Sequence, residues 1–169
     1  LQLAMDLVHA DKGVIAIKAI HGDAVRALQQ AIAADDRLAL HFLPNVYPVG
    51  EERAVVREVL GTLLDAGSLP SKAGAVIINV ETLQRVAEAV DDKKPLIDKD
   101  VTVAGKLNGP EVQVFHDLPL GMAVSDVLEK AGGLGKEYGE LIMGGPFMGR
   151  RTSLDAPIVK TTGSIIAAE

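Results

Sequence analysis

The sequence contains no cysteine and no tryptophan, and aromatic residues make up only 3% of its 169 residues. Without cysteine, the chain itself has no disulfide, no catalytic thiol and no cysteine-ligated cluster. Apolar residues nevertheless account for 48% of the chain. We therefore expect cores built from Val, Ile, Leu and Ala, in one ordinary domain or two small ones.

The chain also lacks an excess of positive charge, because its formal net charge is −6. A protein without a basic face has little to neutralise phosphates, so we expect no nucleic-acid binding. No apolar run reaches the ~18 residues that cross a bilayer, and no secretory signal opens the chain. We expect no direct membrane insertion. Leu1 opens inside a helical pattern and Glu169 follows an apolar run, which suggests an internal fragment of a longer protein.

The four histidines, His9, His21, His41 and His116, are scattered without the spacing of metal ligands. We therefore predict no metal site. His116 is followed by Asp117, and the two are a candidate catalytic pair. A surface turn is the favoured interpretation, because no nucleophile with a motif around it accompanies them.

The first part of the chain alternates apolar runs with amphipathic patterns. Residues 1–10 have the spacing of a helix that Gly13 would close, and residues 14–20 form a β-branched run typical of a strand buried on both faces. A helix is predicted over 24–34 and a strand over 38–43. Strand, helix and strand with short links predict a parallel βαβ unit.

Residues 47–56 indicate a turn that leads into a helix over about 51–64. Gly50 permits a tight turn or the close approach of a ligand. Glu51 and Glu52 would lie in the first helical turn, where the helix dipole favours carboxylates. Taken alone, the pattern is that of a well-capped amphipathic helix.

A third buried strand is predicted over 75–78, followed by a helix that begins at Asn79. Asn79 is a candidate N-cap. Its side chain is alternatively directed at a ligand, because ligands of open α/β sheets bind at the carboxyl ends of the strands. The polar stretch 91–95 then suggests a boundary, which gives domains 1–98 and 99–169.

Residues 99–169 predict an α+β arrangement similar to a β-grasp. A turn containing Asn108 and Gly109 would join two strands in a hairpin. A helix with Val124 and Leu128 directed inward follows. The strands are expected at 101–105, 111–115, 140–143, 157–160 and 164–168.

The glycine-rich stretch 144–149 lacks the Lys-Ser/Thr pair of a phosphate-binding P-loop, and Pro146 removes one amide donor. We predict that it is a hinge-like connection, with Phe147 and Met148 packed between the two domains.

Two segments together resemble a known family. Tyr47-x-x-Gly50-Glu51-Glu52-x-Ala54 and Asn79-Val80-Glu81-Thr82-Leu83 are similar to paired motifs of the flavin-bearing, NADH-oxidising subunit of respiratory complex I. The later part of the chain resembles the C subunit of the Rnf electron-transport complex and its proline-reductase-associated relative. The segments that carry this second resemblance are 67–70, 101–105, 144–149 and 157–163.

The resemblance covers nearly the whole chain and implies an FMN-linked electron-transfer module. It implies a Rossmann-like FMN-binding part over 1–98 and a β-grasp, soluble-ligand-binding (SLBB-like) domain over 99–169. The residues that would line the flavin and nicotinamide side are Tyr47, Gly50, Glu51 and Glu52. Asn79 and Thr82 would lie near the FMN phosphate, since an amide and a hydroxyl at a helix N-terminus supplement backbone donors.

The family's glycine-rich flavin loop is expected before Leu1, and the cysteines of its 4Fe-4S clusters beyond Glu169. The resemblance therefore implies half a flavin site here and weak or absent FMN binding by this segment alone. The family's first motif usually reads Gly-Gly-Glu-Lys, whereas residues 49–53 read Val-Gly-Glu-Glu-Arg, which weakens the expectation of nicotinamide use.

The implied function is electron transfer between a nicotinamide or ferredoxin-type donor and iron–sulfur clusters outside this segment. The implied partners are other subunits of a redox complex, with NAD(H) as a further candidate. The implied location is the cytoplasm, or the inner face of the cell membrane through the parent complex. Two alternatives stay open: a non-catalytic docking or ligand-binding module, and an unrelated α/β fold with chance motif matches.

Overall fold

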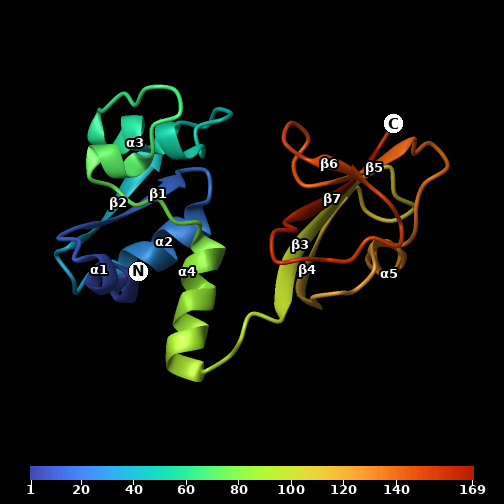
Figure 1. Ribbon diagram of the computed structural model, residues 1–169, viewed down its shortest axis with the longest axis horizontal. Helices are drawn as coiled ribbons and strands as arrows, with labels where there is room; N and C mark the ends of the chain where they lie inside the picture. The colour runs from blue at the N-terminus through green and yellow to red at the C-terminus, as the bar shows by residue number, and fades with distance from the viewer. The chain divides into compact units, whose positions relative to one another are not determined.

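The computed structural model describes residues 1–169 and divides them into two compact units, Leu1–Asp92 and Lys93–Glu169 (Figure 1). We call them the N-terminal unit and the C-terminal unit. The division falls within the polar stretch 91–95. None of the helices combines the length and the apolar character that a membrane span requires.

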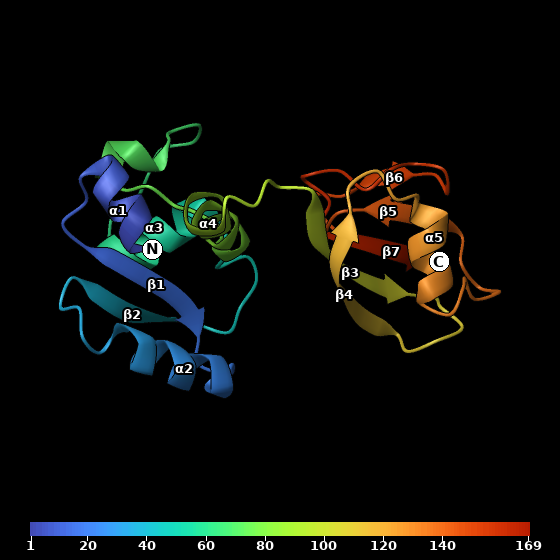
Figure 2. The same cartoon turned by 90° about the horizontal axis from the view of Figure 1, so that it is seen from below.

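The N-terminal unit contains the predicted parallel βαβ arrangement. Strand β1 (Gly13–Lys18) pairs in parallel with β2 (Leu38–Leu43), from Gly13 opposite Leu38 to Lys18 opposite Leu43. Helix α2 (Gly22–Ile32) connects the two strands. Figure 2 shows α2 on one side of the strand pair and α3 (Glu52–Leu60), which contacts both strands, on the other.

The ends of the helices are set by local backbone chemistry. Helix α1 (Gln2–Val8) ends at His9, which adopts the left-handed conformation with φ of 54°. Gly13 is therefore not its cap. Gly13 instead opens β1, where a Cβ atom would lie 2.6 Å from Sδ of Met5. Helix α3 ends at Leu60 rather than near residue 64, because Gly61 adopts a left-handed cap with φ of 69°.

The remaining helical segments of this unit follow α3. They are a short 3-10 helix (Pro70–Ala73), α4 (Val80–Ala87) and a π-helical turn (Glu88–Asp92).

The prediction of a third strand over 75–78 is wrong. These residues adopt no regular secondary structure and pair with no strand, and the sheet of this unit contains only β1 and β2. Val76 is 61% exposed. Burial of β1 on both faces is also wrong, because Val14 is 39% exposed. A β-branched run indicates a strand, but its pairing and burial depend on neighbouring elements that the run does not specify.

The C-terminal unit is a five-stranded mixed sheet with the order β4-β3-β7-β5-β6. Its last strand, β7, lies between β3 and β5, parallel to the first and antiparallel to the second. This is the β-grasp arrangement, which confirms the predicted fold class of an α/β part followed by an α+β part. The elements are β3 (Asp98–Gly105), β4 (Val112–Pro119), α5 (Val124–Lys130), β5 (Glu140–Met143), β6 (Arg150–Thr152) and β7 (Ser164–Ala168).

One core holds the C-terminal unit together. Burial alternates along β3 and β7, so that one face of the sheet is inward. Helix α5 covers this face (Figure 2) with apolar residues at helical spacing. The core residues are Val101, Val103, Leu118, Val124, Val127, Leu128, Ala131, Leu141, Ile158, Ile165 and Ala167.

The segment 157–160, predicted as a strand, forms only an isolated bridge between Pro157 and Ala123. Ile158 is buried all the same, and its amide donates to the carbonyl of Met122 at 2.8 Å. Strand β6 was not predicted, because three polar residues, Arg150–Thr152, carry no apolar alternation.

Candidate functional site

The loop before α3 presents two of the predicted site residues to solvent. Tyr47 is 69% exposed, and a Cβ atom at Gly50 would meet nothing within 4 Å. The loop is anchored by Val49, which is only 3% exposed, and by a hydrogen bond from the Glu51 amide to the Pro48 carbonyl at 2.8 Å. The space beside the Gly50 Cα atom is therefore not filled by other atoms of the chain.

Glu51 is the N-cap of α3 rather than a residue of its first turn. Its Oε2 atom accepts hydrogen bonds from the amides of Arg53 and Ala54, both at 3.1 Å. Desolvation raises the pKa of Glu51, but these amides and the Arg53 guanidinium outweigh it and hold the pKa below its usual range. The carboxylate is thus engaged by its own helix. Glu52 is the first helical residue and is exposed.

Asn79 is the N-cap of α4, so the first of its two predicted roles is the one that the structure shows. Its Oδ1 atom accepts from the amide of Glu81 at 2.9 Å. Thr82 lies in the first turn of α4 and is exposed. An amide, a hydroxyl and the positive end of the helix dipole therefore lie within one helical turn, a combination that suits a phosphate.

None of the six predicted residues lines either of the two pockets found in the structure. Both pockets lie in the C-terminal unit. The six residues lie at two helix starts within the N-terminal unit and are Tyr47, Gly50, Glu51, Glu52, Asn79 and Thr82. Their joint action on one flavin stays a prediction.

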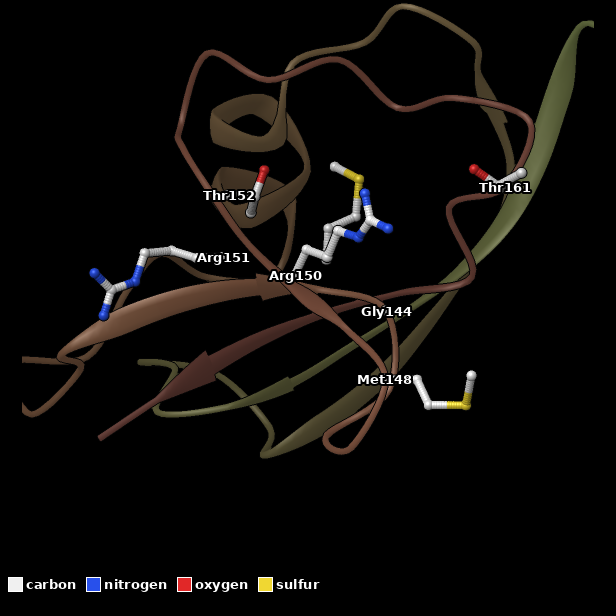
Figure 3. Close-up of a pocket in the computed structure, with 7 residues that line it drawn as sticks. Gly144, Met148, Arg150, Arg151, Thr152 and Thr161 are labelled. Atoms are coloured by element: carbon white, nitrogen blue, oxygen red, sulfur yellow. The ribbon is translucent and has the colours of Figure 1, made fainter. Parts of the chain in front are cut away.

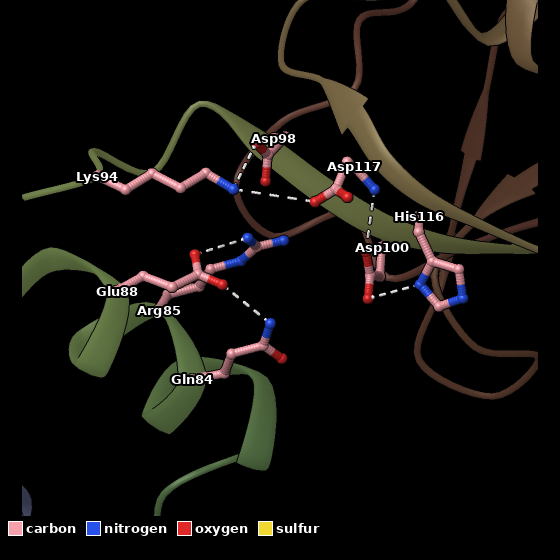
Figure 4. A network of polar contacts seen from close by, with 8 residues as sticks. All are labelled: Gln84, Arg85, Glu88, Lys94, Asp98, Asp100, His116 and Asp117. Atoms are coloured by element: carbon pink, nitrogen blue, oxygen red, sulfur yellow. Dashed lines mark hydrogen bonds and ion pairs between the residues drawn. The ribbon is translucent and has the colours of Figure 1, made fainter. Parts of the chain in front are cut away.

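Figure 4 shows two polar networks, one in each unit. In the C-terminal unit, Nδ1 of His116 lies 3.0 Å from Oδ2 of Asp100, and Oδ1 of Asp100 accepts from the Asp117 amide at 3.1 Å. His116 therefore pairs with Asp100 on the neighbouring strand β3. The predicted surface turn is wrong, because His116 and Asp117 both lie within β4. In the N-terminal unit, Glu88 accepts from Arg85 and Gln84, both at 2.9 Å.

A pocket that sequence reasoning missed opens beside β6 in the C-terminal unit, with a volume of about 360 Å³ (Figure 3). Six of its seven lining residues lie within residues 143–152, which include the glycine-rich stretch 144–149, and the seventh, Thr161, comes from a later segment. The seven residues are Met143, Gly144, Met148, Arg150, Arg151, Thr152 and Thr161. Phe147 and Met148 are 77% and 87% exposed, and their packing between the two domains stays a prediction.

Comparisons with known proteins agree with the resemblance. The chain is 36% identical over 167 residues to cobalamin reductase PduS of Salmonella typhimurium, covering 98% of this chain and 36% of that protein. It is 33% identical over 168 residues to the C subunit of the Na⁺-translocating ferredoxin:NAD⁺ oxidoreductase complex of Acetobacterium woodii, covering 98% and 37%. For the C subunit of the ion-translocating oxidoreductase complex of Yersinia enterocolitica, the identity is 31% over 167 residues, covering 98% and 24%.

The chain thus spans about a third or less of the length of these relatives. The predicted resemblance to the Rnf-type C subunit is confirmed by these two C subunits of ion-translocating oxidoreductase complexes. Residues 1–88, more than half of the chain, match the family model of the Nuo51 FMN-binding domain. The chain therefore belongs to the Nuo51 FMN-binding domain family.

Proposed function

We propose that this chain is part of an FMN-linked electron-transfer subunit and that its N-terminal unit supplies one side of the flavin site. The observation that carries the proposal is the family match over residues 1–88, which contain both helix starts with the six candidate residues. The relatives named as a reductase and as subunits of ferredoxin:NAD⁺ oxidoreductase complexes support electron transfer.

In this proposal the start of α4 holds the FMN phosphate. Asn79 and Thr82 supplement the backbone N–H groups there, and the helix dipole adds favourable charge. Tyr47 and Gly50 offer an exposed aromatic face and an open backbone to the flat ring. Glu51 and Glu52 serve as acceptors for hydroxyl groups, with Glu51 also fixing the start of α3. The bound flavin supplies the redox chemistry, and the protein supplies binding and orientation.

The electrons pass to iron–sulfur clusters held outside this chain, which has no cysteine to ligate one. The donor is a nicotinamide or ferredoxin-type carrier, and other subunits of a redox complex are the partners. We assign the C-terminal β-grasp unit as the SLBB-like domain of this module, peripheral to a membrane complex. The alternative, a docking module, rests on the exposed residues Phe147 and Met148.

A titration of the chain with FMN, followed by flavin fluorescence, tests the proposal. We expect weak binding, with a dissociation constant near the millimolar range, which corresponds to roughly 4 kcal/mol, because half the site is present. Riboflavin, which lacks the phosphate, should bind more weakly still. Micromolar affinity for FMN would contradict the half-site, and equal binding of FMN and riboflavin would contradict the role of the α4 start.

Matched variants sharpen the titration. Asn79→Ala should weaken FMN binding and leave riboflavin binding unchanged, because the change removes the phosphate contact and the cap at the start of α4, whereas the proposed ring contacts lie at the start of α3. Asn108→Ala, in the β3–β4 turn of the C-terminal unit, is the control and should bind both ligands as the unmodified chain does. An equal loss in both variants would contradict the assignment.

A further inference from the structure

The connection between β5 and β6 exposes two large apolar side chains that are adjacent in sequence. Phe147 is 77% exposed and Met148 is 87% exposed, the highest values among the large apolar residues of the C-terminal unit. The chain has only three phenylalanines and four methionines. Single exposed apolar residues are ordinary on a surface, but an adjacent Phe-Met pair at the end of a hairpin is an unusual concentration of apolar surface.

The backbone of this connection is held in one shape. The Gly149 amide donates to the Gly145 carbonyl at 2.7 Å, and the Gly144 amide donates to the Ser164 carbonyl at 2.8 Å. A Cβ atom at Gly149 would lie 2.4 Å from Cγ2 of Ile142, so the close return of the chain requires glycine. Pro146 restricts φ further. A partner that contacts this preformed tip therefore spends little free energy on ordering it.

The charge beside the tip is positive. Residues 143–154 contain two arginines and no carboxylate, in a chain whose net charge is −6. Arg151 is neutralised by Glu140, with Nε donating to Oε2 at 2.8 Å. Arg150 points in another direction (Figure 3) and lines the pocket with Met148. Unlike Arg151, it is not paired with a carboxylate. One cation thus remains available next to the apolar pair.

We propose that Phe147, Met148 and Arg150 form a docking tip for another protein of the redox assembly, one that presents an apolar pocket rimmed by carboxylates. Aromatic, methionine and arginine side chains are enriched at protein interfaces, and a lone cation selects an acidic rim. The tip is an anchor within a larger interface, since stable interfaces bury about 800 Å² per partner. This proposal rests on the proposed function in one respect, namely that the partner belongs to a redox assembly.

A membrane surface is the weaker match for this tip. Binding to anionic lipids draws on clusters of basic residues, each adding to the attraction. Here Arg151 is already paired, and the chain as a whole is acidic. An apolar pocket on a partner protein, with a few carboxylates at its rim, would bury the two apolar side chains and pair with the one available charge.

Site-specific photocrosslinking in the protein's own cells identifies the occupant. With p-benzoylphenylalanine at position 147 of the full-length protein, we expect one dominant crosslinked protein, with the crosslinked peptide near Asp or Glu residues. The same probe at Val112, which is 60% exposed on the edge strand β4, should not give this product. Crosslinks to lipid, to a second copy of this chain, or equally from both positions would overturn the proposal.

Binding measurements with the purified crosslinked protein then test each side chain. Phe147→Ala should weaken binding about tenfold or more without changing the thermal midpoint, because an exposed hot-spot residue is lost. Arg150→Gln should weaken binding and reduce its salt dependence. The control variant Glu140→Gln/Arg151→Gln removes the neighbouring ion pair at constant net charge and should bind normally.

Unchanged binding of both Phe147→Ala and Arg150→Gln would overturn the proposal. So would sedimentation of the chain with phosphatidylcholine–phosphatidylserine vesicles in a manner that depends on Phe147. Neither variant should alter the FMN titration, because the flavin residues lie in the N-terminal unit. Failure of the docking tip is therefore distinguishable from failure of the flavin site.

Discussion

The C-terminal unit buries its apolar side chains in one core, whereas the N-terminal unit leaves many of its own exposed. The β-grasp core contains eleven buried residues from the sheet, α5 and their connections. The buried large apolar residues of the N-terminal unit are Met5, Leu43, Val49 and Val56. Fourteen of the 22 exposed large apolar residues of the chain belong to the N-terminal unit.

The difference follows from the two sheets. The β-grasp sheet has five strands and one helix-covered face, which is enough to form a closed core. A parallel sheet is normally covered by helices on both faces and contains several strands, but the N-terminal sheet has two. We therefore expect burial to stabilise the N-terminal unit less than the C-terminal unit.

Separating the two units should produce the largest effect. Residues 93–169 alone should unfold cooperatively, with a free energy of unfolding of a few kcal/mol, on the order of 0.05–0.15 kcal/mol per residue. Residues 1–92 alone should show a broad, weakly cooperative transition. Denaturation followed by circular dichroism measures both, and a sharper transition in residues 1–92 would reverse the comparison.

Core truncation should give the next largest effect. Ile165 is fully buried in the β-grasp core, so Ile165→Ala should lower the free energy of unfolding of the C-terminal unit by about 2–5 kcal/mol. The matched change Val76→Ala, at a 61% exposed site in the N-terminal unit, should cost about 0.5 kcal/mol or less. Urea denaturation of the intact chain compares the two, and similar losses would contradict the difference in packing.

Removing the α4 cap should have a smaller effect, confined to the N-terminal unit. Asn79→Ala loses the bond to the Glu81 amide and should cost about 1 kcal/mol. Asn79→Ser keeps a capping oxygen and should recover most of that loss. Hydrogen exchange of the α4 amides provides the measurement. Equal protection in the Ala and Ser variants would show that the cap contributes nothing.

Glu51 should give the smallest effect, visible as a pH dependence. The pKa of Glu51 is lowered in the folded state. Its contribution to the free energy of unfolding is therefore present above the unfolded pKa of about 4.3 and is lost as the pH falls through the folded pKa. Glu51→Gln should therefore reduce the loss of α3 helicity on acidification below about pH 5. Identical acid titrations of the two proteins by circular dichroism would exclude this contribution.

Local sequence patterns were sufficient to predict much of the secondary structure of the C-terminal unit. The turn at Asn108 and Gly109 predicts the β3–β4 hairpin, and the spacing of Val124 and Leu128 predicts the inward face of α5. Both depend on residues that are close in sequence. Strand β6 could not be predicted, because it is short and polar and is defined by pairing with β5.

Nonlocal contacts explain the other differences. Residues 75–78 have the composition of a strand, but no partner strand lies beside them. The place of Asn79 before a helix predicted its capping role. The pocket around Arg150 could not be predicted, because it depends on how β6 folds back on β5 and on the contribution of Thr161. Sequence motifs therefore suggested the candidate flavin residues, whereas the exposure of Phe147 and Met148 became visible only in the structure.

Amide chemical-shift mapping of the chain with FMN tests the central claim most directly, because it reports on both units at once. We expect shifts at residues 50–54 and 79–83, at the starts of α3 and α4, and unchanged amides throughout the C-terminal unit. With riboflavin, the shifts at 79–83 should disappear while those at 50–54 persist. Shifts confined to the pocket beside β6, or no shifts at either helix start, would contradict the assignment of the flavin site to the N-terminal unit.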